Sequence, residues 1–195
     1  MTLHARARAT WLAASLAGTL STTGAAPAVY ELDPTQTFVQ FEVRHFDTST
    51  LRGRVGPVRG EVTLDADAGR GRLGLVIDMR TLDTGFRLLD ARLRQADLLD
   101  VTGHPEAYFV AERFRFVQGL PTELTGEFTL RGASVPLTLK ALRFACQGAV
   151  NTAAQRCGGD FEGEVLRSAF SATFGLPLVA DRVRILVQAE GTRRH

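Results

Sequence analysis

Lysine is nearly absent from this chain of 195 residues, and no charge of one sign dominates it. Lys140 is the only lysine among 23 basic residues, so the cations are almost all planar, permanently charged guanidinium groups. The 23 basic residues face 21 acidic ones, and removal of Arg6 and Arg8 with the N-terminal segment described next would leave 21 of each. This balance argues against a polybasic nucleic-acid-binding protein. A hydrophobic share of 45% and a charged share of 23% are those of a globular domain.

Long apolar runs are also missing. The run at residues 11–20 is about half the length of a membrane-spanning helix, follows a short basic start and precedes a small, polar stretch. This three-part plan is that of a secretory signal peptide, and we predict that residues 1–28 are cleaved. Cleavage after Ala25 is one alternative, and an uncleaved, buried N-terminal helix is another. The mature domain, residues 29–195, is then expected to be soluble and either periplasmic or secreted.

Only two cysteines are present, Cys146 and Cys157, and they lie in a glycine-rich, polar stretch. In an oxidising compartment two lone thiols more often pair than remain free, so we predict a disulfide bond that closes a loop. A metal site would need further histidine or cysteine ligands nearby, and the sequence has none there.

The dominant pattern is alternation of apolar and polar residues, which predicts half-buried antiparallel strands. In residues 39–45 every second residue is apolar up to His45, which therefore shares the inward face. Further strands of this kind are predicted at residues 60–65, 73–78, 124–130 and 183–190.

Three further segments resemble strands less regularly. In residues 107–116 and 135–144 the apolar parity shifts midway, which predicts β-bulges or bends of the kind that a closing barrel needs. Residues 161–174 form a weaker candidate strand. Turns are predicted at residues 67–69, at residues 131–132 and at residues 158–159, where glycines occur.

Residues 86–100 break the alternation because their apolar residues have helical spacing. We predict one amphipathic helix there, or two short ones. No linker or repeat divides the chain. The predicted fold is therefore all-β: a single antiparallel, lipocalin-like barrel of about eight strands with one short helical segment.

Motifs for catalysis are scarce. The sequence has no G-x-S-x-G element, no cysteine beside a histidine, no phosphate-binding glycine loop and no histidines at metal-ligand spacing. Asp97 and Asp100 form a carboxylate pair of the kind that is usually solvated. We therefore predict no catalytic residues, no metal and no cofactor. A barrel of this size is either packed solid or holds one small ligand, and both alternatives stay open.

In its order of motifs the chain resembles the YceI-like proteins, exported lipocalin-like barrels associated with binding isoprenoids and other long-chain amphiphiles. The similarity extends over residues 29–190. The motifs that carry it are residues 30–34, 39–45, 77–85, 90–100, His104-Pro105, Phe109, 124–133, 167–170 and 181–183.

Some positions depart from the family pattern. Gln36-Thr37 stand where the family usually has a His-Ser pair, and Leu89 and Arg92 replace an arginine and a histidine of the helix. A headgroup contact through those histidines is therefore not expected here, whereas an apolar tunnel is. The cysteine pair looks like a feature of a subgroup.

The leading functional hypothesis is an exported carrier or sequestering protein whose barrel binds a long-chain amphiphilic lipid, such as an isoprenoid, a quinone or a fatty-acid derivative. No nucleic acid is expected as a partner, while transient contact with a membrane or membrane protein and homodimer formation stay open. The candidate ligand-binding residues are Val39, Phe41, Val43, His45, Leu64, Leu75, Ile77, Asp90, Arg92, Phe109, Phe128 and Phe170, with His45, Asp90 and Arg92 at the polar end.

Two other functions remain in view. One is a filled-barrel interaction or stress-response protein that docks on a membrane partner and has no ligand of its own. The other is an enzyme that acts on an isoprenoid, for which His45 and Asp90 form the one acid–base pair to consider.

Overall fold

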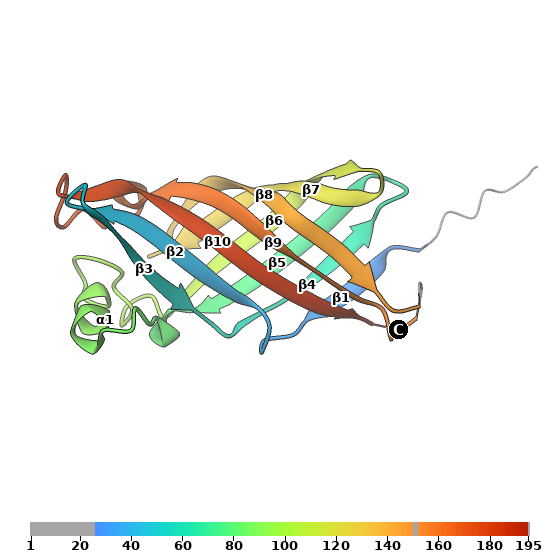
Figure 1. The fold of residues 1–195 in the computed structure, drawn as a ribbon, viewed down its shortest axis with the longest axis horizontal. Coiled ribbons are helices and arrows are strands. Elements are labelled where there is room, and N and C mark those ends of the chain that lie inside the picture. The colour runs from blue at the N-terminus through green and yellow to red at the C-terminus, as the bar shows by residue number, and fades with distance from the viewer. Residues whose placement is uncertain (1–25, 150–151, 195) are drawn as a thin grey trace, which may run out of the picture.

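A computed structural model describes residues 26–149 and 152–194, in which ten strands, one α-helix and two short 3-10 helices follow one another (Figure 1). The first half contains β1 (Ala28–Leu32), β2 (Phe38–His45), β3 (Ser49–Val55), β4 (Val58–Asp65), β5 (Arg70–Asp78), η1 (Met79–Thr81) and α1 (Arg87–Leu93). The second half contains β6 (Glu106–Val117), β7 (Leu120–Leu130), β8 (Ala133–Gln147), β9 (Arg156–Leu166), η2 (Arg167–Phe170) and β10 (Val179–Arg193).

Eight of the strands close into an antiparallel barrel. The order around the ring is β1, β4, β5, β6, β7, β8, β9 and β10, and β10 pairs with β1 to complete it. Every pairing is antiparallel, and each strand from β4 to β10 pairs with the one before it, apart from β4, which pairs with β1. The prediction of an all-β, eight-stranded barrel with one short helical segment is therefore confirmed.

The strands β2 and β3 extend the sheet beyond the ring at one end of the barrel (Figure 1). The long strand β10 pairs with β2 along most of its length and with β1 only at its C-terminal end. Thr37 lies in the connection between β1 and β2 and is fully buried. Its hydroxyl accepts a hydrogen bond from the Glu190 amide of β10, and its carbonyl accepts one from the Val58 amide of β4. β3 lies at the end of the strand order, and its outer edge forms one isolated bridge, from Arg54 to Asp83.

Both predicted irregular strands contain register shifts. In β6 the shifts lie between Ala111 and Arg113 and between Arg115 and Phe116, and in β8 one lies between Ala141 and Arg143. Broken apolar alternation therefore correctly predicted β-bulges in this chain.

Four details of the predicted elements were wrong. Only Arg87–Leu93 of residues 86–100 is helical, because the chain then leaves the helical hydrogen-bond pattern, and the Leu99 amide bonds to the Leu93 carbonyl six residues back. Residues 158–159 lie inside β9 and not in a turn, and the strand predicted over residues 161–174 ends at Leu166, where η2 begins. The strands β1 and β3 were not predicted.

The predicted disulfide bond is present between Cys146 and Cys157, which face each other across β8 and β9. Residues 1–25, and with them most of the predicted signal peptide, lie outside the described residues. Within the described ranges, no helix is long and apolar enough to cross a membrane.

Candidate functional site

The barrel contains a cavity of about 290 Å³ at the end that α1 and the β2–β3 hairpin occupy. Side chains from β2, β3, β5, β7, β9 and β10 form its wall, and α1, η2 and the segments beside them contribute the rest of its lining. Of the 24 residues that line it, 21 are apolar, and the other three are His45, Arg92 and Arg167. The volume lies near the lower limit of about 300 Å³ for small-molecule sites, and an apolar wall with few polar groups is typical of them.

Eight of the twelve candidate ligand-binding residues line this cavity. Five of them lie on β2 and β5 and point into the cavity, because every second side chain of a strand points to the same face. The eight are Val39, Phe41, Val43, His45, Ile77, Arg92, Phe128 and Phe170. The rings of Phe128 and Phe170 contact each other edge to face, with their centroids 5.6 Å apart.

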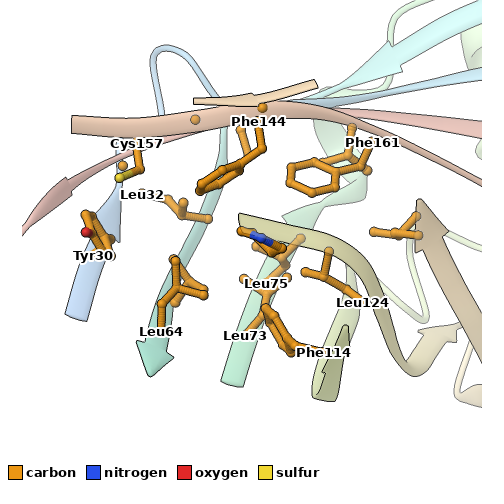
Figure 2. Close-up of a pocket in the computed structure, with 18 residues that line it drawn as sticks. Tyr30, Leu32, Leu64, Leu73, Leu75, Phe114, Leu124, Phe144, Cys157 and Phe161 are labelled. Carbon is orange, nitrogen blue, oxygen red and sulfur yellow. The ribbon is translucent and has the colours of Figure 1, made fainter. Parts of the chain in front are cut away.

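Leu64 and Leu75 instead line a second, smaller cavity of about 60 Å³ in the other half of the barrel. Four of its 18 lining residues are aromatic, namely Tyr30, Phe114, Phe144 and Phe161. Figure 2 shows Phe144 and Phe161 pointing inward from one side and Phe114 from the other. The two halves of the barrel therefore differ: one is nearly packed solid, and the other is open.

Phe109 lies outside the lining of both cavities. Its side chain is 2% exposed, and its neighbours across the sheet are Leu75 of the smaller cavity and Phe128 of the larger one. This position places the ring in the packed layer that separates the two cavities.

Asp90 also lies outside both linings, although its side chain is 6% exposed. Its carboxylate accepts hydrogen bonds from the amide and the hydroxyl of Thr84, at 2.8 and 2.7 Å. The hydrogen bond from the Thr84 hydroxyl holds the pKa of Asp90 below its ordinary value, against the opposing effect of burial. Asp90 therefore orders the segment before α1 and does not line the cavity, and no hydrogen bond or ion pair joins it to His45.

Arg92 borders the cavity with its charge already paired. Its guanidinium donates two hydrogen bonds to the Asp97 carboxylate, at 2.7 and 2.6 Å, and lies 4.1 Å from the centre of the Phe174 ring. The hydrogen bond to Asp97 raises the pKa of Arg92, and the same contact lowers the pKa of Asp97. The pair is neutral overall and fixes α1 against the segment that contains Phe174.

Arg167 is a lining residue that sequence reasoning did not select. It donates hydrogen bonds to four backbone carbonyls, those of Ala172, Phe174, Val179 and Ala180. Burial lowers the pKa of Arg167 from its ordinary value. This one side chain thus holds residues 171–180 across the end of the cavity.

Beside it, Asp181 accepts hydrogen bonds from the amide and hydroxyl of Ser168, at 2.8 and 2.6 Å. The bond from the Ser168 hydroxyl lowers the pKa of Asp181. The Arg-Ser pair at residues 167–168 was noticed in the sequence as a family motif, and this was the signal that could have identified Arg167.

Most of the other unpredicted lining residues come from segments without regular alternation. The full set of these other lining residues is Leu51, Val55, Met79, Leu82, Leu89, Leu93, Leu98, Leu99, Leu130, Val165, Ala172, Phe174, Val179, Val183 and Ile185. Leu130, Val183 and Ile185 belong to strands that alternation predicted, so these three could have been included. Among the described residues, no group of three or more histidine, cysteine or carboxylate side chains is arranged to hold a metal ion.

Comparisons with known proteins agree with this architecture. The profile of the YceI-like domain family matches residues 30–191. A protein named YceI from Salmonella newport is 29% identical over 184 residues, which cover 92% of this chain and 95% of that protein.

Solved structures share the fold. BcnA of Burkholderia cenocepacia superposes with a TM-score of 0.64 at 22% identity, covering 82% of this chain and 98% of the other. A polyisoprenoid-binding domain from Saccharophagus degradans gives 0.59 at 17% identity, covering 85% and 98%. The YceI protein of Campylobacter jejuni gives 0.63 at 19% identity, covering 77% and 90%. The match of the family profile to most of the chain shows that this protein belongs to the YceI-like domain family.

Proposed function

We propose that this protein binds a long-chain apolar ligand, such as an isoprenoid, a quinone or a fatty-acid derivative, in the 290 Å³ cavity, and acts as a carrier or sequestering protein. The observation that carries the proposal is the cavity itself, whose wall is apolar at 21 of 24 positions. Each methylene group transferred from water to such a surface contributes about 0.8 kcal/mol before the costs of ordering. The Saccharophagus degradans neighbour, described as polyisoprenoid-binding, supports the same ligand class.

The polar residues at the cavity support a ligand without a strong charge requirement. Arg92 is paired with Asp97, and Arg167 is occupied by four carbonyls, so neither offers an unengaged cation to a headgroup. His45 is the third polar lining residue and is half-buried at the end of β2. The proposal is therefore one of binding and not of catalysis.

Native mass spectrometry of protein purified without detergent, combined with organic extraction, tests the proposal. We expect a stoichiometric long-chain adduct, or uptake of an added prenyl alcohol by protein that is purified empty. A protein that carries no adduct and takes up neither prenyl alcohols nor fatty acids would overturn it.

A pair of variants locates the ligand. Val43→Trp places a large ring in the cavity, whereas Val110→Trp adds the same ring on the outer face of β6, where Val110 is 45% exposed. We expect Val43→Trp to reduce uptake at least about tenfold, because the ring takes the volume and contacts of the ligand, and Val110→Trp to leave it unchanged. Urea unfolding of both variants shows whether the barrel is retained.

We further propose that the chain is exported and that residues 1–28 are removed. Ala28 pairs with Leu64 at the very start of β1, so cleavage after Ala28 removes only the terminal pair of that strand. N-terminal sequencing of protein from the exporting compartment is expected to begin at Val29. A sequence that begins at Met1 would refute cleavage.

A further inference from the structure

Five large apolar side chains are exposed around the open end of the cavity. We call them the apolar rim: Phe46, Phe86, Leu88, Phe174 and Leu178, which are 51%, 58%, 73%, 58% and 59% exposed. They come from three separate segments, namely the β2–β3 turn, the start of α1 and the segment between η2 and β10. Figure 1 shows all three segments at the same end of the barrel.

Contacts join these segments to one another and to the cavity. The Phe46 amide donates a hydrogen bond of 2.7 Å to the Leu178 carbonyl. The Phe174 ring lies against Arg92 of α1 and also lines the cavity, while Leu88 precedes the lining residue Leu89. The rim is therefore continuous with the cavity wall through Phe174 and through Leu88, which adjoins Leu89.

The rim carries little charge. Residues 171–178 contain no ionisable side chain, the β2–β3 turn contributes Asp47, and the start of α1 contributes Arg87. Arg92 beside it is neutralised by Asp97. A surface that is apolar and nearly neutral does not suit a nucleic acid or a strongly charged protein partner. Exposed phenylalanine and leucine side chains on projecting segments suit the boundary between headgroups and acyl chains of a lipid bilayer.

We propose that the apolar rim docks on the surface of a lipid bilayer and places the cavity mouth against the membrane. The proposal rests on the proposed function in one respect, since a long-chain apolar ligand resides in a bilayer before it is bound. Docking through the rim lets the long-chain ligand pass from the bilayer into the cavity without exposure to water. A folded protein partner seated on the same residues would cover the mouth, so continuity between rim and cavity favours the bilayer.

Co-sedimentation with vesicles of phosphatidylethanolamine and phosphatidylglycerol tests the docking. The rim variant combines Phe46→Ser, Leu88→Ser and Leu178→Ser, none of which lines the cavity. We expect its vesicle binding to be at least about tenfold weaker than that of the unmodified protein, because three inserted apolar side chains are lost. Its uptake of farnesol from solution without vesicles is expected to be unchanged.

A matched control removes the same kind of side chain elsewhere. Val117, Leu120 and Leu142 lie toward the other end of the barrel and are 54%, 45% and 55% exposed. The corresponding triple serine variant is expected to bind vesicles like the unmodified protein. Urea unfolding of both triple variants verifies that each retains the fold.

The outcomes separate the docking from the ligand. Farnesol uptake without any vesicle binding by the unmodified protein overturns the docking and leaves the proposed function intact. Vesicle binding that depends on the rim without any uptake overturns the proposed function alone. Equal loss in the rim and control variants, or a rim variant that instead dissociates a homodimer in sedimentation velocity, also overturns the docking.

Discussion

Replacement of Arg167 with methionine measures how much this one side chain contributes to the free energy of unfolding by holding the open end of the barrel. Its guanidinium donates hydrogen bonds to four carbonyls between Ala172 and Ala180. A hydrogen bond from a charged donor stabilises by about 1.5–3 kcal/mol, so four of them amount to roughly 6 kcal/mol at the lower value. Residues 171–180 are partly exposed, and water can replace about half of this. We therefore expect the free energy of unfolding to fall by about 3 kcal/mol.

Urea-induced unfolding gives this free energy, and amide hydrogen exchange of residues 171–180 shows where the loss is located. Arg167→Lys should recover little of it, because a single ammonium group cannot reach carbonyls on several sides. Arg182→Met is the control: Arg182 is 65% exposed and pairs with Glu164, so its loss should cost less than about 1 kcal/mol. A cost for Arg167→Met no larger than that of the control would refute the reasoning.

Three further variants probe other parts of the molecule. Replacing Cys146 and Cys157 with serine should lower the free energy of unfolding by about 3 kcal/mol in urea titrations, because an open chain of this loop length has more freedom when unfolded. Phe109→Ala should cost about 3–5 kcal/mol in the same assay, and crystallography should show the two cavities joined. Asp90 has a lowered pKa through Thr84, so its contribution is complete above about pH 4 and is lost as the pH falls through its folded-state pKa. Asp90→Asn should flatten that part of the acid-unfolding curve, and an unchanged curve would contradict the assignment.

A glycine explains why the alternation of apolar and polar residues did not predict β3. In β3 the inward positions are Leu51, Gly53 and Val55, and the apolar alternation is interrupted at Gly53. A Cβ atom at Gly53 would lie 2.4 Å from the ring of Phe41, so the phenylalanine fills the space that a side chain would otherwise occupy. The alternation is complete only when two neighbouring strands are considered together, which the sequence of one strand cannot reveal.

The same effect produced the wrong turn in β9. A Cβ atom at Gly159 would lie 2.4 Å from the Arg143 carbonyl oxygen and 3.2 Å from the rings of both Phe144 and Phe161. The glycine therefore permits close packing within a strand and does not mark a reversal of the chain. By contrast, the regular alternation of β2 and the parity shifts of β6 and β8 are local signals, and they were sufficient to predict those strands and their bulges.

The candidate residues divide according to whether their position depends on strand periodicity. Phe41 and Ile77 reach the cavity because alternation alone determines their face. Asp90 does not, because its side chain turns back to Thr84, a contact between residues six apart that helical periodicity does not predict. Arg167 was missed because its partners are backbone carbonyls, which every residue has, so the residue types of the partners do not reveal the contact.

The two halves of the barrel differ in the volume of the cavity that each contains. The cavity toward the disulfide end has a volume of about 60 Å³, whereas the one at the mouth end has about 290 Å³. Continuous strand pairing stabilises the packed half. At the mouth, side chains hold the segments in place: Arg131, for example, donates hydrogen bonds to the Phe170 and Ala96 carbonyls. Local opening there breaks a few side-chain hydrogen bonds and leaves the strand ladders intact. Opening at this end would therefore expose the 290 Å³ cavity without unfolding the half that carries the disulfide bond.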